Sequence, residues 1–234
     1  MSSKKIHAVI LARGGSKGIK NKNLVLINKK PLIYWSIKAC LNTKQIKNVW
    51  VSSDSLKILK VAKKNGALTI KRPQSLSSDQ STSESGWIHA VKEIRKKEKI
   101  THLLALQATS PIRGKDDLSK AINLYNNKKS DSLFSSTFLD SHFTWIKTKG
   151  KLKANYNILI KRKRRQNIEK KFIENGSFYF FSVEKFLKLK KRLFGKIINF
   201  NQSKFKSFEI DNYEDLTIVK SLLKNVPKGL NIIK

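Results

Sequence analysis

The sequence predicts an α/β protein with a doubly wound, mostly parallel sheet and a small mid-chain excursion. Short apolar runs alternate with amphipathic segments at short intervals through about the first 137 residues. This alternation is typical of repeated β-loop-α units. Polar or glycine-rich loops follow the apolar runs, as expected where parallel strands present ligand loops at their carboxyl ends. We therefore expect one domain over residues 1–234, with the excursion at about 140–171, where mixed polar segments and the run KRKRR break the alternation.

In the first third of the chain, the expected strands are 6–11 (IHAVIL), 48–53 (NVWVSS) and 67–71 (ALTIK). Pro31 occupies the first turn of a helix that continues through LIYWSIKACLNT, a position where proline is well tolerated. Asp54 or Ser53 is expected to cap a second helix, which runs to about Asn65 and ends at Gly66.

In the remaining chain, Ser81 and Glu84 have capping-box spacing and predict a helix to about Lys97. The further expected elements are strands at 102–107, 132–137, 175–182 and 208–211, and helices at 115–127 and 212–224. No internal repeat is evident.

Composition narrows the class of protein. No apolar run approaches the roughly 20 residues that span a bilayer. The single cysteine, Cys40, shares a helical stripe with Ile33 and Ile37, so packing is a better explanation for it than chemistry. One cysteine also excludes an internal disulfide framework and fits a reducing compartment. We expect a cytoplasmic protein without a membrane segment.

The net charge of +34 has two explanations, a nucleic-acid interface and compositional bias. Most of the excess is lysine, spread from Lys4 to Lys234, and no helix-turn-helix, zinc-finger or RNP-type pattern accompanies it. We therefore expect no specific nucleic-acid partner, although such a charge attracts small polyanions such as nucleoside triphosphates.

The segment LARGGSKGIKNKN, residues 11–23, follows the first expected strand and precedes a helix, where anion-binding loops occur. Its glycines Gly14, Gly15 and Gly18 allow backbone N–H groups to approach phosphate oxygens, while Arg13, Lys17 and Lys22 add positive charge. The spacing matches neither GxxxxGK[ST] nor GxGxxG. From the residues alone, a phosphate loop and a flexible basic turn both remain open.

Six segments in order resemble the CMP-sialic acid synthetases (acylneuraminate cytidylyltransferases). They are ARGGSKGIxxKN at 12–23, VSSD at 51–54, RPxxLxxD at 72–79, LQATSPIR at 106–113, and the pair RRQN…ENGSFYFF at 164–181 with EIDNYEDL at 209–216. The resemblance extends from about residue 6 to 224 and implies a Rossmann-like nucleotidyltransferase fold. It implies cytidylyl transfer from CTP to a nine-carbon acidic keto-sugar of the sialic, legionaminic or pseudaminic type.

The resemblance also implies roles for particular residues. It assigns the nucleotide to Arg13, Gly15, Ser16, Lys17, Asn23, Arg72 and Ser83; the sugar to Gln107, Arg165, Asn175 and Tyr179; and Mg²⁺ (or Mn²⁺) to Asp211 and Glu209. The expected catalytic groups are Arg13, Lys17, Lys22 and Asp211. The expected partners are CTP and the sugar acid, and the excursion is expected to form a homodimer.

Several of these residues have structural explanations as well. Asp211 begins the segment DNYE and could cap the last helix, and Asn175-Gly176 could be an ordinary turn. Tyr179 could belong to the core, because alternation in SFYFF separates it from Phe178 and Phe180. Asp54 is interpreted as a helix cap and is left out of the site.

The chain departs from the family pattern at Lys20, Ala108 and Glu209, where proline, proline and aspartate are frequent. Intact lysines at 17 and 22 favour activity over a silent relative. The related Kdo-activating enzymes are an alternative, although their first loop usually lacks RGGSKG. A basic nucleic-acid-binding protein is the alternative from another class.

Overall fold

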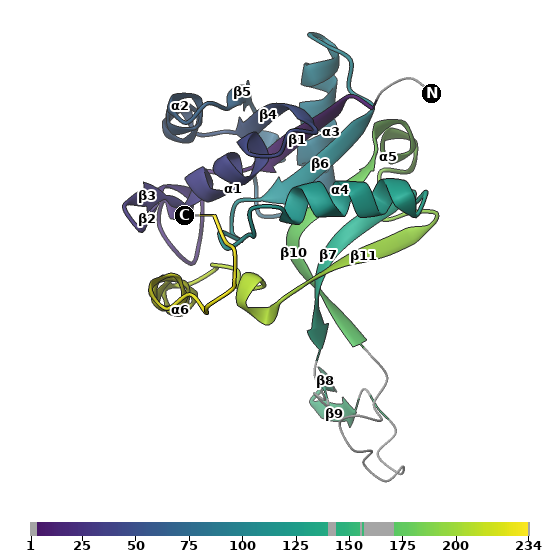
Figure 1. Cartoon of the computed structure of the whole chain (residues 1–234). Coiled ribbons are helices and arrows are strands. Elements are labelled where there is room, and N and C mark those ends of the chain that lie inside the picture. Colours follow the sequence, from purple (N-terminus) through teal and green to yellow (C-terminus); the bar gives the residue numbers. More distant parts are fainter. Residues whose placement is uncertain (1–3, 140–143, 155, 157–170, 234) are drawn as a thin grey trace.

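The computed structural model describes residues 4–139, 144–154, 156 and 171–233 (Figure 1). Its strands are β1 (Ile6–Leu11), β2 (Leu26–Ile27), β3 (Lys30–Pro31), β4 (Ile46–Ser53), β5 (Leu68–Lys71), β6 (His102–Gln107), β7 (Ser132–Leu139), β8 (Trp145–Thr148), β9 (Lys151–Ala154), β10 (Lys171–Ser182) and β11 (Ile197–Gln202). Its α-helices are α1 (Leu32–Leu41), α2 (Leu56–Lys64), α3 (Ser83–Arg95), α4 (Asp117–Asn127), α5 (Val183–Leu189) and α6 (Tyr213–Lys224). Short 3₁₀ turns lie at Lys22–Leu24, Gln74–Leu76 and Lys204–Lys206.

The main sheet has seven strands in the order β11-β7-β10-β6-β1-β4-β5. Neighbours β6, β1, β4 and β5 are parallel, and so are β7 and β11, whereas β10 runs antiparallel to both β6 and β7. The chain leaves β1 toward β4 on one side and later returns to β6 on the other. The predicted doubly wound, mostly parallel sheet is therefore confirmed, and its topological switch point lies between β1 and β6.

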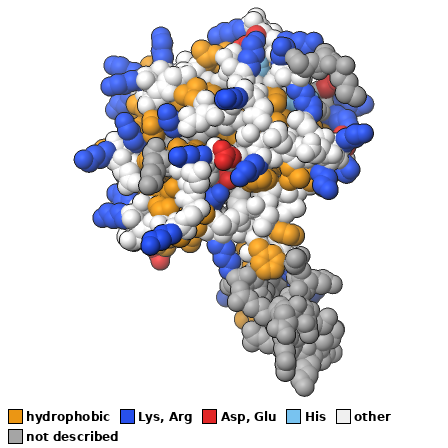
Figure 2. Space-filling model, viewed as in Figure 1, with side chains coloured by type: hydrophobic (Ala, Val, Ile, Leu, Met, Phe, Trp, Pro, Cys, Tyr) orange, Lys and Arg blue, Asp and Glu red, His pale blue; other side chains and the backbone are white. Residues whose placement is uncertain are grey.

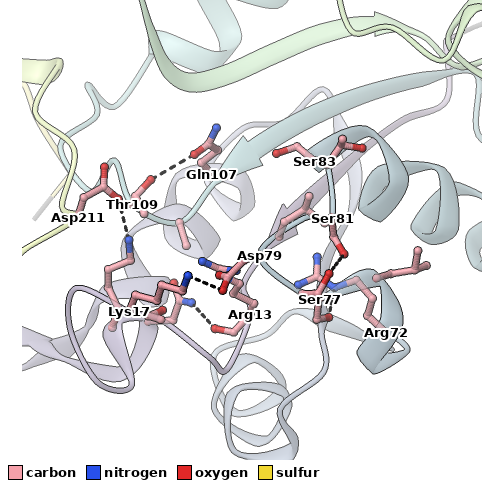
Figure 3. A pocket seen from close by; sticks show the side chains of 18 of the residues that line it. Arg13, Lys17, Arg72, Ser77, Asp79, Ser81, Ser83, Gln107, Thr109 and Asp211 are labelled. Carbon is pink, nitrogen blue, oxygen red and sulfur yellow. Dashed lines mark hydrogen bonds and ion pairs between the residues drawn. The ribbon is translucent and has the colours of Figure 1, made fainter. Parts of the chain in front are cut away.

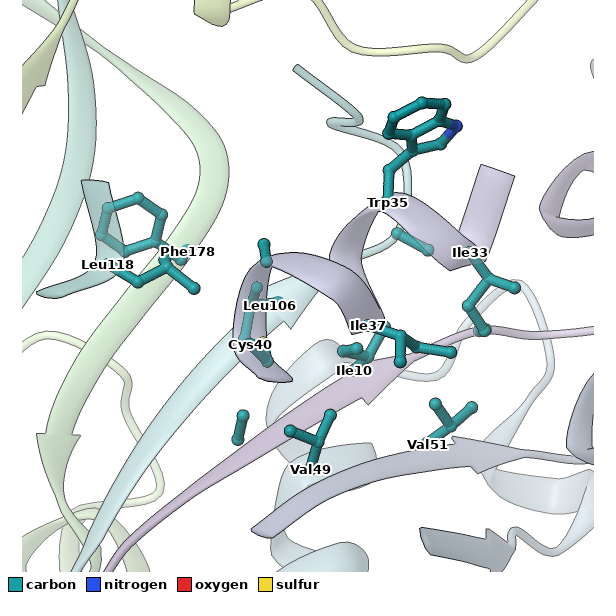
Figure 4. Close-up of a cluster of buried hydrophobic side chains, with 14 of the residues drawn as sticks. Ile10, Ile33, Trp35, Ile37, Cys40, Val49, Val51, Leu106, Leu118 and Phe178 are labelled. Carbon is teal, nitrogen blue, oxygen red and sulfur yellow. The ribbon is translucent and has the colours of Figure 1, made fainter. Parts of the chain in front are cut away.

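Helices cover both faces of this sheet, with α1 and α4 on one side and α3 and α5 on the other (Figure 1). Strands buried on both faces need apolar residues at successive positions, which explains runs such as IHAVIL. In β1, for example, Ile10 points into the cluster beneath α1 (Figure 4), whereas Val9 points into the cluster beneath α3. Cys40 is fully buried in the first cluster, as expected for a packing residue.

Two of the expected helix caps are wrong. Thr82, and not Ser81, caps α3 by accepting a hydrogen bond from the Ser85 amide. Ser81 instead donates to the Ser75 carbonyl, because the preceding loop folds back on itself. Ser55 occupies the N-cap of α2 without a side-chain cap. The Asp54 carboxylate is used elsewhere, as an acceptor for the Gly14 amide.

The second half of the chain differs more from expectation. Residues 208–211 form no strand, and the edge strand β11 was not predicted. Helix α6 is capped by Asn212 in a reciprocal box with Asp215, so Asp211 lies one residue outside the cap. Within the expected excursion, β8 and β9 form a separate hairpin that projects from the sheet (Figure 1). In the part of the chain that the structure describes, no helix has the length and apolarity needed to cross a membrane.

Candidate active site

A pocket of about 480 Å³ lies where β1 and β6 end, at the switch point of the sheet (Figure 3). Ligands of doubly wound proteins bind in the crevice outside the carboxyl ends of the strands at such a point. The lining comes from the loop after β1, the 72–83 segment, the end of β6 and the start of the α6 region. It comprises Leu11, Arg13, Ser16, Lys17, Gly18, Lys22, Asn23, Arg72, Leu76, Ser77, Ser78, Asp79, Ser81, Thr82, Ser83, Gln107, Ala108, Thr109 and Asp211.

The loop after β1 is held in place by contacts with distant segments. The Gly14 amide donates to Asp54 Oδ1 at 2.9 Å, and Asn23 Nδ2 donates to the Arg13 carbonyl at 2.9 Å. At Gly18 the backbone passes so close to the 211 segment that a Cβ would lie 2.0 Å from the Asp211 carbonyl oxygen. The third glycine of the loop is therefore required by packing, whereas Gly15 has open space beside it and is not among the lining residues.

Each lysine and arginine that this loop contributes to the pocket is paired with a carboxylate. Arg13 Nη1 lies 2.7 Å from Asp79 Oδ1, and Lys17 Nζ lies 2.8 Å from Asp79 Oδ2 (Figure 3). Lys22 Nζ lies 2.8 Å from Asp211 Oδ1. The loop is a positively charged surface at the mouth of a cleft, which suits a polyphosphate.

Arg72 forms the opposite wall with the first turn of α3. Its side chain is buried, and Nε donates to Ser77 Oγ at 2.9 Å. Burial lowers the pKa of Arg72, and nearby Asp54 opposes that change. Gly86 allows this position, since a Cβ there would lie 3.0 Å from Arg72 Nη1. Ser83 lines the pocket beside the helix N-terminus, where backbone N–H groups are free to donate to a ligand.

Gln107 lies at the end of β6, and its backbone is fixed by the buried Arg113. The Arg113 guanidinium donates to the Gln107 carbonyl at 3.0 Å, to Ser36 Oγ at 2.8 Å, and to Ser177 Oγ and O at 2.9 Å. Burial lowers the pKa of Arg113 to about 10, so the group stays charged at neutral pH. This network joins β6, α1 and β10 beneath the pocket.

The two carboxylates expected to hold a divalent cation occupy different environments. Asp211 has a side chain that is 68% exposed, whereas Glu209 is partly buried. Burial, followed by the charge of Asp211, raises the pKa of Glu209 to about 7. Mg²⁺ favours oxygen ligands and often takes one or two carboxylates together with substrate phosphates. Asp211 lines the pocket, whereas Glu209 is not among the lining residues. Among the described residues, no group of three or more His, Cys, Asp or Glu side chains is arranged to hold a metal.

The expected sugar residues are not all brought together. Gln107 lines the pocket, while Arg165 lies outside the described residues. Asn175 is buried, and its side-chain amide is hydrogen-bonded to Ser135, Gln202 and Ser207. Tyr179 is 2% exposed and packs in one cluster with Trp87 and Phe181. It therefore occupies a core position, which is the structural alternative that alternation in SFYFF predicts.

Sequence reasoning left several lining residues without a role. Asp79 is the most consequential, because it pairs with two of the loop cations. Asp79 is the last residue of the RPxxLxxD segment, so that motif already singles it out, although nothing in the local sequence indicates a partner 66 residues away. The sequence predicts only a helix cap at Asp54, whereas its carboxylate accepts from the Gly14 amide in the loop after β1. Ser77, Ser78, Ser81 and Thr109 also line the pocket.

The profile of the cytidylyltransferase family matches residues 7–229. The chain belongs to the cytidylyltransferase family. N-acylneuraminate cytidylyltransferase A of Danio rerio is 37% identical over 188 residues, which are 78% of this chain and 42% of that protein. Pseudaminic acid cytidylyltransferase of Campylobacter jejuni is 32% identical over 179 residues, which are 74% of this chain and 76% of that protein. The expected kinship with CMP-sialic acid synthetases is thus confirmed.

Among solved structures, a CMP:2-keto-3-deoxy-manno-octonic acid synthetase complexed with CTP superposes with a TM-score of 0.72 at 16% identity, covering 95% of this chain and 99% of that one. At this identity the likeness shows the fold alone, which is the Rossmann-like nucleotidyltransferase fold. The chain spans about two fifths of the length of the Danio rerio relative.

Proposed function

We propose that the protein transfers the cytidylyl group of CTP to a nine-carbon acidic keto-sugar and releases pyrophosphate. The observation that carries the proposal is the pocket at the sheet's switch point, whose mouth holds Arg13, Lys17 and Lys22 on one loop. A triphosphate needs such a concentration of charge, and the opposite wall at Arg72 and Ser83 offers donors to a base. The sugar class follows that of two relatives, an N-acylneuraminate cytidylyltransferase and a pseudaminic acid cytidylyltransferase, which are 37% and 32% identical.

In the reaction, the anomeric hydroxyl oxygen of the sugar attacks the α-phosphorus of CTP. The new P–O bond replaces the bond between the α-phosphorus and the oxygen of the β-phosphate, and the hydroxyl proton passes to water as pyrophosphate leaves. Lys22 lies beside the attacked phosphate, whereas Arg13 and Lys17 hold the leaving group. The protein mainly positions the reactants and balances charge, as in other phosphoryl-type transfers.

Asp211 and Glu209 would hold Mg²⁺ (or Mn²⁺), which supplies charge neutralisation on the phosphates when it is bound. Gln107 is proposed to contact the sugar acid, since it lies at the end of β6 in the same pocket. Arg165 is proposed for the same role from its RRQN segment. Asn175 and Tyr179 are both buried and already hydrogen-bonded to other side chains, which favours supporting roles for these two residues.

The deciding experiment is a pyrophosphate-release assay with CTP, Mg²⁺ and a panel of nine-carbon and eight-carbon sugar acids. We expect release with a nine-carbon acid and little with the eight-carbon one. Lys17→Ala and Asp211→Ala should lose most of the activity, and full transfer rates in both would refute the scheme. Salt-dependent DNA binding without pyrophosphate release would instead support a nucleic-acid role. Lysine and arginine side chains are spread over the visible face, which argues against such a dedicated patch (Figure 2).

We also propose that the excursion pairs two copies of the chain. Large apolar side chains are exposed along it, namely Trp145, Ile146 and Leu152, and Phe172 and Ile173 are exposed on β10 directly after it. Light scattering coupled to size exclusion should give the mass of a dimer, and a monomeric mass at micromolar concentration would contradict this.

A cytoplasmic location is proposed because Cys40 is a free thiol.

A further inference from the structure

The Asp79 carboxylate pairs with Arg13 and Lys17, two cations that would otherwise be free to contact a polyphosphate. Its two oxygens contact two different groups, Arg13 Nη1 at 2.7 Å and Lys17 Nζ at 2.8 Å. All three side chains line the pocket, with Asp79 reaching in from the 72–82 segment (Figure 3). Two oxygens bridging two cations is also the arrangement that a bound phosphate group would make.

We propose that Asp79 is an internal competitor for the β,γ-phosphate subsite, which weakens the binding of CTP and pyrophosphate and favours pyrophosphate release. The inference rests on the proposed function. In the absence of nucleotide the carboxylate pairs with Arg13 and Lys17. Arriving triphosphate displaces it, and the carboxylate recovers both cations when pyrophosphate departs.

The exposure of these groups makes such an exchange feasible. The side chains of Asp79 and Lys17 are 48% and 79% exposed, so water and salt screen their attraction. An ion pair of this kind is readily replaced by a ligand that carries several negative charges. The pair between Lys206 and Asp117, at 14% and 9% exposure, illustrates a buried bridge that would not exchange in this way.

Asp79 is not needed to build the phosphate loop. The loop backbone is fixed by Asp54 at Gly14 and by Asn23 at the Arg13 carbonyl, and both contacts are independent of Asp79. A role in orienting the cations for the ligand would make loss of the carboxylate harmful. Competition makes the same loss beneficial to binding, so the two roles predict opposite signs.

Asp79 also offsets repulsion within the pocket. The lining includes the cations Arg13, Lys17, Lys22 and Arg72, and the carboxylates Asp79 and Asp211. The charge of Arg13 contributes to the lowered pKa of Arg72, which reflects this crowding. Removal of one carboxylate leaves the cations less balanced and hence more dependent on a bound anion.

The test is calorimetric titration of the full chain with pyrophosphate alone and with CTP alone, at fixed Mg²⁺ and without sugar. Asp79→Asn should bind both ligands about three- to tenfold more tightly than the wild type, as expected for the loss of two exposed ion pairs. Asp79→Glu, which keeps the charge, should remain near the wild type. In turnover, Asp79→Asn should show stronger product inhibition by pyrophosphate.

Glu93→Gln is the matched control, because Glu93 on α3 pairs with Lys96 outside the pocket and loss of its carboxylate changes the net charge equally. It should leave both affinities unchanged. Equal or weaker binding by Asp79→Asn would overturn the competition, as would an equal gain in Glu93→Gln. If the wild type binds neither CTP nor pyrophosphate, the proposed function itself fails, so the two failures are distinguishable.

Discussion

Lys22 and Asp211 are 189 positions apart in the chain, yet the lysine ammonium donates to the aspartate carboxylate at 2.8 Å. The Lys22 side chain is 14% exposed, far less than that of Lys17 at 79%. The pair therefore joins the loop after β1 to the 211 segment. Both side chains line the pocket.

Replacement of Lys22 by methionine should lower kcat/KM for cytidylyl transfer by about 10²- to 10³-fold, because a group that stabilises transition-state charge is lost. Steady-state pyrophosphate release measures the effect. Lys20→Met is the matched control, since Lys20 is exposed on the same loop and does not line the pocket. Comparable losses in both variants would mean that only the overall charge matters.

Gly18→Ala should lower the melting temperature and weaken CTP binding. The added methyl group would lie 2.0 Å from the Asp211 carbonyl oxygen, so the loop or the 211 segment must move. Thermal unfolding with and without CTP measures both effects. Gly15→Ala is the control for stability, because nothing lies within 4 Å of its Cβ position. Unchanged melting in Gly18→Ala would contradict the close approach.

Asn175→Ala should lower the free energy of unfolding by about 2–4 kcal/mol, because it leaves buried polar partners unsatisfied. Asn175 accepts from Ser135 Oγ at 2.6 Å and donates to Gln202 at 3.1 Å and Ser207 at 3.0 Å. Urea denaturation provides the measurement. Asn199→Ala, which loses one partly buried bond to Ser136, should cost less than about 1 kcal/mol. Normal stability with a raised KM for the sugar would restore Asn175 to the sugar site.

His102 should make the protein less stable in mild acid. Burial, followed by the charge of Lys4, lowers the pKa of His102 to about 4, from 6.5 in the unfolded chain. Between these values the unfolded state binds more protons, so stability falls as pH falls. The linkage amounts to about 2 kcal/mol at pH 5 relative to pH 8.

His102→Phe keeps a ring between Phe180 and Tyr125 but cannot be protonated. Urea denaturation of both proteins at pH 8 and pH 5 isolates the contribution of His102. The wild type should lose about 2 kcal/mol more than the variant over this interval. Parallel losses would show that His102 is charged in the folded protein.

The central strands were predictable from the sequence because burial on both faces requires continuous apolar residues. The expected strands 6–11 and 102–107 coincide with β1 and β6. Edge strand β11 lacks this signal. Its residues are partly exposed, and it exists through pairing with β7, which lies about 65 positions earlier. Pairing of this kind is not encoded locally.

The same distinction applies to the site. The loop at 13–23 was found because its glycines and cations are contiguous, whereas its partners are distant. Neither the Asp79 pair nor the Gly14–Asp54 contact follows from spacing along the chain. The predicted caps of α2 and α3 are wrong for a related reason. Several Ser, Thr and Asp residues precede α2 and α3, and the fold of the preceding loop decides which one faces the free amides.

The contact between Gly18 and Asp211 has a consequence for synthesis. During synthesis the loop that carries Gly18 leaves the ribosome early, but Asp211, which packs against it, emerges almost two hundred residues later. A nascent chain that ends before α6 lacks this buttress, however well its first strands are paired. Acquisition of nucleotide binding would then follow synthesis of the 211 segment, so that CTP would stabilise only molecules in which this segment has reached the loop.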